Sequence, residues 1–298
     1  MNPAEFYSAK REDLYFPCKN AAFFPLGRPA TDAALCAELS RIAYCQNENN
    51  FAFDQERIKQ TLASVGLTVR AFVESSKCEL NHGFHCFLAV RESGNAEERL
   101  AVIAFRGTNK DDPTNLFADG DALFESWEKG GEVHRGFKHA LAELRGRLDA
   151  LRPGIDCRIL FTGHSLGAAL ATLLAGAWKR PTDRRDALFT FGSPRVGNPQ
   201  FVATLAGLAG ERYVDCCDGV TLVPPEMLGY RHFGHAHYIA RNRRVIVAPG
   251  TATLLADKFA AVVQYALMYG WRPGNVTVRD LADHAPINYI MAVGSNPP

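Results

Sequence analysis

Apolar residues recur along the chain with two different spacings, and the two spacings alternate. Runs rich in β-branched and aromatic residues predict strands over 67–74, 84–92, 99–105, 158–162, 187–192 and 212–216. Apolar residues three or four positions apart predict helices over 31–45, 137–151, 166–178, 199–209 and 253–268. This alternation predicts an α/β fold with a mostly parallel central sheet flanked by helices, in which functional loops follow the carboxyl ends of strands.

The composition is that of an ordinary globular protein. Of 298 residues, 47% are apolar and 22% are charged, which argues against a disordered or fibrous chain. An α/β protein of this length is commonly one domain, so we expect a single domain over residues 1–298. The formal net charge of +1 provides no basic surface for phosphates, and we expect no nucleic-acid partner.

The start of the chain carries no apolar run preceded by basic residues. No segment reaches the roughly 18 consecutive apolar residues that a membrane-spanning helix needs, so we expect no transmembrane segment. From these two observations we expect a cytoplasmic protein, or one exported by a route without a classical signal peptide. The eight cysteines are not spaced as in a small disulfide scaffold, and we expect most of them to be buried thiols.

One pentapeptide points to nucleophilic catalysis. The sequence 163-GHSLG-167 lies between the apolar strand 158–162 and the small-residue helix 166–178. In this context the Gly-x-Ser-x-Gly pattern is typical of a sharp strand-to-helix turn that exposes a serine hydroxyl. We therefore predict that Ser165 is the nucleophile and that the backbone N–H of Leu166 contributes to the oxyanion hole. The alternative is a serine that merely caps an ordinary turn.

The general base is not expected to be His164, because residues next to the serine in so tight a turn project away from it. In this arrangement an acid and then a histidine follow the serine along the chain. Asp215 and Asp218 are candidates for the acid, and Asp218 is favoured because it falls just beyond the strand, where an active-site loop begins. The base is either one of the histidines in 230-YRHFGHAHYI-239, foremost His232, or the later His284.

Five motifs in order resemble one family. They are 101-AVIAFRGT-108, 133-VHRGF-137, 162-TGHSLGAALA-171, 191-FGSPRVGN-198 and 284-HAPINY-289. Together they resemble the class 3 (fungal-type) triacylglycerol lipases, a family of the α/β-hydrolase superfamily. The resemblance implies an α/β-hydrolase fold with a lid-like insertion, and ester hydrolysis by Ser, His and Asp.

The resemblance also implies roles for individual residues. Asp218 begins a stretch similar to the Asp-x-Val-x-x-x-Pro segment that carries the family's catalytic acid. His284 matches the family's catalytic histidine, which lies on a loop that opens the last helix, and it would act as general base and then general acid. Thr108 ends a motif whose last residue supplies an oxyanion-hole donor. His232 remains the second choice for the base.

Residues 114–132 occupy the place where the family carries its lid. Leu123, Phe124 and Trp127 fall within one turn of a predicted helix, and Gly130 and Gly131 follow as a hinge. Such a helix would cover an apolar cleft in water and open at a lipid surface. The alternative is a surface helix that packs Phe124 and Trp127 permanently.

The predicted function is hydrolysis of carboxylic esters of lipids through an acyl-enzyme on Ser165. The expected substrate is a lipid or small ester, met at a lipid–water interface, and we expect no cofactor and no metal. His232, His235 and His237 suggest a metal site, but alternate strand residues point to opposite faces and do not converge on one ion. A phospholipase A1, another carboxylesterase or an effector that attacks phospholipids would use the same triad, and a non-catalytic binding protein is a further alternative.

Overall fold

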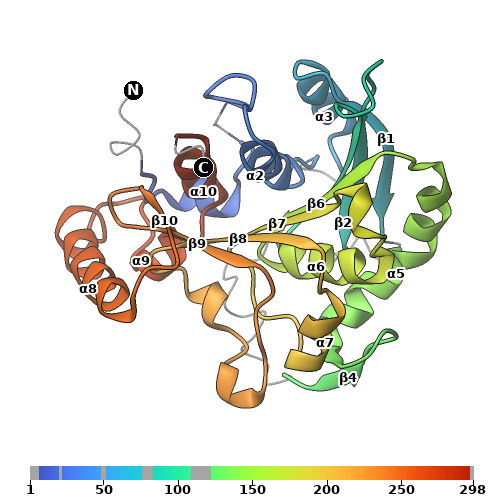
Figure 1. Ribbon diagram of the computed structural model, residues 1–298. Coiled ribbons are helices and arrows are strands. Elements are labelled where there is room, and N and C mark those ends of the chain that lie inside the picture. Colours follow the sequence, from blue (N-terminus) through green and yellow to red (C-terminus); the bar gives the residue numbers. More distant parts are fainter. Residues whose placement is uncertain (1–6, 20–21, 48–51, 76–82, 109–121, 296–298) are drawn as a thin grey trace.

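An eight-stranded sheet crosses the molecule (Figure 1). The computed structural model describes residues 7–19, 22–47, 52–75, 83–108 and 122–295. Its spatial order is β1-β2-β3-β6-β7-β8-β9-β10. The five central strands β3, β6, β7, β8 and β9 run parallel, whereas β1, β2 and β10 pair antiparallel at the edges. The strands are β1 Thr68–Glu74, β2 His85–Arg91, β3 Leu100–Phe105, β6 Arg158–His164, β7 Ala187–Phe191, β8 Ala209–Asp215, β9 His235–Ile239 and β10 Val245–Val247. The predicted mostly parallel α/β architecture is confirmed.

Helices cover both faces of the sheet (Figure 1). Helices α2 and α10 pack on one face, and α5 and α6 pack on the other. The α-helices are α1 Arg11–Tyr15, α2 Asp32–Ile42, α3 Gln55–Ala63, α5 Arg135–Leu151, α6 Leu166–Trp178, α7 Pro199–Thr204, α8 Thr251–Met268, α9 Arg279–Ala282 and α10 Pro286–Ser295. Short 3-10 turns are η3 Arg152–Gly154, η4 Thr182–Arg184, η5 Gly219–Leu222 and η6 Glu226–Leu228.

Helix α6 lies against the middle of the sheet because its residues are small. All 13 residues from Leu166 to Trp178 are buried, and eight of them are Ala, Gly or Thr. Short side chains let the helix axis approach the strands closely, while leucines fill the remaining space. The observed bounds equal the predicted 166–178. The first turn of this helix is thereby fixed directly beside the carboxyl end of β6.

The turn between β6 and α6 is tight. Ser165 has φ 58° and ψ −128°, a backbone conformation that non-glycine residues rarely adopt. A Cβ on Gly163 would lie 2.3 Å from the carbonyl carbon of Gly167, and a Cβ on Gly167 would lie 2.3 Å from the carbonyl oxygen of Phe105. Only glycine allows the helix start to pass so close to β3.

The predicted helix at Leu123, Phe124 and Trp127 is wrong. The described part of this segment forms a hairpin of β4 Phe124–Ser126 and β5 Glu132–His134, with Gly130 and Gly131 in its turn at positive φ. Residues 114–121 of the expected lid lie outside the described residues.

Tertiary packing explains the hairpin. Phe124 stacks on Tyr230 with ring centroids 4.2 Å apart, and the buried Trp127 packs edge-on against Phe201 at 5.9 Å. These contacts come from helix α7 and from the loop before β9, and they override the local helical spacing. The alternative that Phe124 and Trp127 are packed against the fold describes this segment better than a mobile helix does.

We predict that Gly167→Ala and Gly163→Ala each lower the free energy of unfolding by about 2–4 kcal/mol, because the new methyl group meets backbone rather than a movable side chain. Guanidinium unfolding at equilibrium measures the change. The matched control is Gly146→Ala in the interior of α5, where a Cβ meets nothing within 4 Å. That substitution should raise the free energy of unfolding by about 0.5–1 kcal/mol. Equal effects at the three positions would contradict the close approach at the turn.

Candidate active site

Asp218 and His284 are in direct contact, and the turn at Ser165 is linked to the His284 loop through His164. Ser165 follows β6, Asp218 follows β8, and His284 precedes α10. His284 Nδ1 lies 2.8 Å from Asp218 Oδ2, and both side chains are almost fully buried. The two residues are 66 positions apart in sequence, so this contact depends on the tertiary fold.

Asp218 is held by three groups. Its Oδ1 accepts a hydrogen bond from the backbone N–H of Val220 at 2.9 Å, which makes Asp218 the N-cap of η5. Its Oδ2 accepts from the hydroxyl of Tyr289 as well as from His284. Burial first, and then the neighbouring Asp218, raise the pKa of Tyr289 well above its ordinary value, so this hydroxyl remains a donor. A carboxylate held in this way can orient an imidazole without moving itself.

The other ring nitrogen of His284 is available for chemistry. Nε2 is buried and has no hydrogen-bond partner among the described residues. The imidazole centroid of His284 lies 4.4 Å from that of His164, the residue directly before Ser165. Because Nδ1 faces Asp218, the unpaired Nε2 is the nitrogen that can take up a proton.

His164 has both ring nitrogens engaged away from Ser165. Its Nε2 lies 2.8 Å from the backbone oxygen of His284, and its Nδ1 lies 2.8 Å from the hydroxyl of Tyr44. Because a carbonyl only accepts, Nε2 carries the proton and Nδ1 accepts from Tyr44. Burial first, and then the charge of His284, lower the pKa of His164 well below its ordinary value. His164 is therefore a neutral bridge between the serine turn and the His284 loop.

A second brace holds the His284 loop from the preceding residue. Asp283 is fully buried, and its carboxylate pairs with Arg279 Nε at 3.0 Å. The same carboxylate accepts from the hydroxyl of Tyr7 at 2.7 Å and from the backbone N–H of Cys217 at 2.9 Å. The loop is thus tied to the N-terminal segment and to the loop that carries Asp218.

The alternative acid Asp215 is used elsewhere. Its carboxylate accepts from Arg243 Nη1 at 2.9 and 2.8 Å, a buried ion pair that stabilises the edge of the sheet. Burial raises the pKa of Asp215, and the adjacent Arg243 opposes that rise. Asp215 lies on β8 itself, as expected, whereas Asp218 lies three residues beyond the strand.

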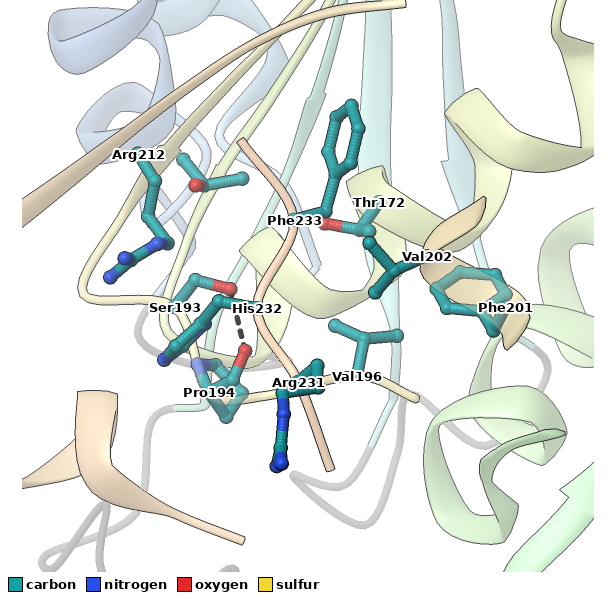
Figure 2. A pocket seen from close by; sticks show the side chains of 11 residues that line it. Thr172, Ser193, Pro194, Val196, Phe201, Val202, Arg212, Arg231, His232 and Phe233 are labelled. Carbon is teal, nitrogen blue, oxygen red and sulfur yellow. Dashed lines mark hydrogen bonds between the residues drawn. The ribbon is translucent and has the colours of Figure 1, made fainter. Parts of the chain in front are cut away.

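The alternative base His232 lies in a separate small pocket with Ser193, Pro194 and Arg212 (Figure 2). Its Nε2 lies 2.8 Å from the backbone oxygen of Thr221, so this nitrogen donates to a carbonyl. Burial first, and then the charge of Arg212, lower the pKa of His232 well below its ordinary value. The geometry joins His284, and not His232, to Asp218.

The histidines considered for a metal do not converge. His237 pairs with Glu211, and His232 with the Thr221 carbonyl. Among the described residues, one group could place ligand atoms near an ion: Cys216, Cys217 and Asp283 lie within 4.8 Å of one another. The Asp283 carboxylate is already neutralised by Arg279, which suits a structural brace better than a metal ligand.

Gly192 was not singled out from the sequence, yet it makes room for the Asp218–His284 pair. It follows β7 with φ 57°, and a Cβ there would lie 2.8 Å from Asp218 Oδ2 and 3.0 Å from His284 Nδ1. The glycine inside the motif 191-FGSPRVGN-198 was the available signal. Tyr289, within 284-HAPINY-289, is a second supporting residue that the sequence reasoning did not assign.

The two candidate oxyanion donors flank the serine turn. Leu166 is the first residue of α6, and first-turn amides have no partner within their own helix. Thr108 follows β3, which pairs with the end of β6 at Phe105 and Gly163. The hydroxyl of Thr108 is buried and has no hydrogen-bond partner among the described residues.

Comparison with known proteins shows a similarity to one family. Residues 102–228 match the family model described as lipase (class 3). A secreted mono- and diacylglycerol lipase of Malassezia globosa is 33% identical over 160 residues, which cover 46% of this chain and 51% of the relative. A lipase of Rhizomucor miehei is 31% identical over 200 residues, which cover 60% of this chain and 54% of the relative.

Residues 102–228 are thus similar to the class 3 lipases, and the wider chain is similar to fungal lipases. The chain spans about half the length of the curated relatives it matches. Among solved structures, a triacylglycerol lipase described as having a serine-protease triad is 25% identical, with a TM-score of 0.55 and coverage of 71% of this chain and 82% of that one. A lipase of Rhizopus microsporus var. chinensis is 26% identical, with a TM-score of 0.54 and coverage of 71% and 76%. The predicted α/β-hydrolase fold is confirmed.

The comparisons correct the expected location of this chain. A cytoplasmic location, or export without a classical signal peptide, was expected from the sequence. Relatives from Malassezia globosa and Fusarium solani are named as secreted lipases, and these findings point to the extracellular space. The expectation was wrong because a pattern at the start of the chain says little about where a family acts.

We predict that the free energy of unfolding falls as the pH drops below about 6.5. His164 and His232 have a lowered pKa in the folded state, so the unfolded state binds protons first. Stability is therefore complete above the unfolded pKa and is lost below it, with a slope of at most about 1.4 kcal/mol per pH unit for each histidine. Guanidinium unfolding between pH 7.5 and 5.5, chosen as roughly one unit on either side of that unfolded pKa, measures the slope. His164→Asn should reduce it, and an unchanged slope would contradict the assignment of His164 as a buried neutral group.

Proposed function

We propose that this chain hydrolyses the carboxylic esters of lipids, with Ser165 as nucleophile, His284 as general base and acid, and Asp218 as the orienting acid. The observation that carries the proposal is the 2.8 Å contact between His284 Nδ1 and Asp218 Oδ2, together with the unpaired Nε2. A neutral imidazole held by a buried carboxylate on one side and free on the other is the arrangement that removes a proton from a hydroxyl. Tyr289 and Val220 hold the carboxylate in place.

The reaction proceeds in two halves. His284 Nε2 takes the proton of Ser165 as Oγ attacks the ester carbonyl, and Asp218 stabilises the imidazolium that forms. The tetrahedral intermediate collapses to an acyl-enzyme as His284 gives the proton to the departing alcohol. Water, deprotonated by the same nitrogen, then attacks the acyl-enzyme, and His284 returns the proton to Ser165 Oγ as the fatty acid is released. The positive φ of Ser165 supports this sequence by holding Oγ away from its own backbone.

Leu166 and Thr108 are the proposed oxyanion-hole residues. The backbone N–H of Leu166 lies at the positive end of α6, which favours the negative charge that develops on the carbonyl oxygen. The unpaired hydroxyl of Thr108 supports a second donor from the neighbouring strand end. An oxyanion would give this buried hydroxyl the partner that it lacks among the described residues.

The proposed substrates are acylglycerols. Relatives are named mono- and diacylglycerol lipases or simply lipases, which favours glycerol esters over phospholipids for this chain. The same names support action outside the cell. We further propose that residues 1–298 act as one domain, since both faces of one sheet carry the cores and α10, which begins just after His284, packs on α2.

Replacement of each triad residue tests the proposal. Ser165→Ala, Asp218→Ala and His284→Ala should each lower kcat for p-nitrophenyl butyrate by at least about 10⁴-fold, because each removes a group on which the proton transfer depends. His232→Ala is the matched control and should retain more than about a tenth of the activity, provided that its circular dichroism shows a folded protein. If His284→Ala stays active while His232→Ala loses activity, the base is wrongly assigned.

The oxyanion hole is tested by Thr108→Val, which keeps the shape of the side chain and removes its hydroxyl. We expect kcat to fall by about 10²–10³-fold with little change in KM, because the donor acts on charge that develops only in the transition state. Thr108→Ser, which restores the hydroxyl, should recover most of the rate. A normal kcat for Thr108→Val would exclude the hydroxyl from the oxyanion hole.

A further inference from the structure

Helix α8 presents large apolar side chains to solvent. Leu255, Phe259 and Leu267 are 65%, 75% and 73% exposed. They are spaced by multiples of four residues, so they lie on the same side of the helix, and Val262 and Val263 lie between them and are about half exposed. This outer side, defined by Leu255, Phe259, Val263 and Leu267, carries no charged residue. A contiguous apolar surface of this kind marks a site of interaction.

The opposite side of α8 fixes the helix to the protein. Ala261 and Tyr265 are buried, and the Tyr265 hydroxyl donates to the Val276 carbonyl at 2.6 Å. Arg279 Nη1 donates to the Ala261 carbonyl at 3.1 Å. Figure 1 shows α8 at the outer rim of the fold, beyond β10. The helix is therefore held by one side and leaves its apolar side outward.

Charge around α8 indicates the kind of partner. Residues 240–274 contain five basic residues and one acidic residue, and four of the basic residues remain once Arg243, buried against Asp215, is set aside. The acidic residue, Asp257, already pairs with Arg241. Arg244, Lys258 and Arg272 form no ion pair with any described residue. The basic border suits an anionic surface, to which each nearby cation contributes attraction.

Trp271 extends the apolar side just beyond the end of the helix. It is 69% exposed, and its Nε1 donates to the Leu267 carbonyl at 3.0 Å, which places the indole beside Leu267. The Arg272 guanidinium lies 5.6 Å from the centroid of the Trp271 ring. An indole next to a cation is the pair found where an apolar surface meets lipid head groups.

We propose that the outer side of α8, with Trp271, docks on an anionic lipid surface. The helix would lie in the plane of the surface, with its apolar side among the acyl chains and Lys258 and Arg272 at the head groups. Among the described residues, no helix combines the length and the continuous apolarity that crossing a bilayer requires.

Docking at α8 would also bring the active-site loop to the lipid. Arg279 contacts both the Ala261 carbonyl of α8 and the carboxylate of Asp283, the residue before His284. The helix and the His284 loop are thus joined by one buried side chain. The benefit to catalysis rests on the proposed ester hydrolase function, whereas the docking itself does not.

Vesicle binding tests the docking separately from catalysis. The full chain carrying Ser165→Ala is mixed with vesicles of phosphatidylcholine and phosphatidylglycerol, or of phosphatidylcholine alone, and the bound fraction is measured by co-sedimentation. We expect binding to the mixed vesicles, weaker binding to pure phosphatidylcholine, and a loss of about tenfold or more in affinity for Phe259→Glu, Leu267→Glu and their combination. Lys258→Glu should weaken binding to the mixed vesicles alone, and added salt should reduce that difference.

Two controls separate this role from a general loss of apolar surface. Leu26→Glu changes an exposed leucine that contacts Gly294, away from α8, and should bind as the parent does. Phe259→Trp keeps the apolar character and should retain binding. With Ser165 intact, Phe259→Glu should hydrolyse soluble p-nitrophenyl butyrate normally and lose about tenfold or more of its rate on emulsified diacylglycerol.

The outcomes are distinguishable. If Phe259→Glu with Leu267→Glu binds mixed vesicles as tightly as the parent, the docking proposal is wrong. If the parent is a dimer that these substitutions convert to a monomer, and neither form binds vesicles, the surface joins two copies and the proposal is again wrong. Vesicle binding without any hydrolysis of soluble or emulsified esters would overturn the proposed function and leave the docking in place.

Discussion

The close approach of α6 to the sheet is the constraint on which the rest of the site depends. The helix starts so near β3 that the carbonyl oxygen of Phe105 occupies the space where a side chain of residue 167 would lie. This approach fixes the turn at Ser165, and it depends on Gly167 and on the small residues that make up most of α6. The strained backbone conformation of Ser165 persists because the packing of α6 against three strands fixes it. The free energy that the turn costs is supplied by the core on that face of the sheet.

Around this fixed turn, the other groups are positioned by hydrogen bonds between loops rather than by the sheet itself. Asp218 is held by its own 3-10 turn and by Tyr289, and His284 is held by Asp218 and by the brace at Asp283. Each of these groups is buried, so a polar group left without its hydrogen-bond partner would lower the free energy of unfolding considerably. A buried network of this kind specifies one arrangement, since half-formed alternatives leave polar atoms without partners.

The sequence predicted the parts that depend on local pattern. Strands β1, β2, β3, β6, β7 and β8, and helix α6 to the residue, follow from spacing and composition, whereas β4, β5, β9 and β10 were not predicted. The pattern indicated a loop for Asp218, and the family resemblance implied one for His284; the structure brings the two residues into contact, while their catalytic roles remain predictions. The helix predicted from local spacing at Phe124 and Trp127 was wrong, because these side chains pack on Tyr230 and Phe201, which are distant in sequence. Gly192 and Tyr289 were missed for the same reason: their importance lies in what surrounds them in space.

The hydrogen bond between His164 and the backbone oxygen of His284 has a mechanical consequence. His164, the residue before Ser165, donates to the backbone oxygen of His284, and Tyr44 anchors the same imidazole from the other side. Any displacement of the His284 loop must therefore pull on the serine turn through a rigid ring, or else break a buried hydrogen bond. The turn and the loop are mechanically coupled, so a movement of one is transmitted to the other.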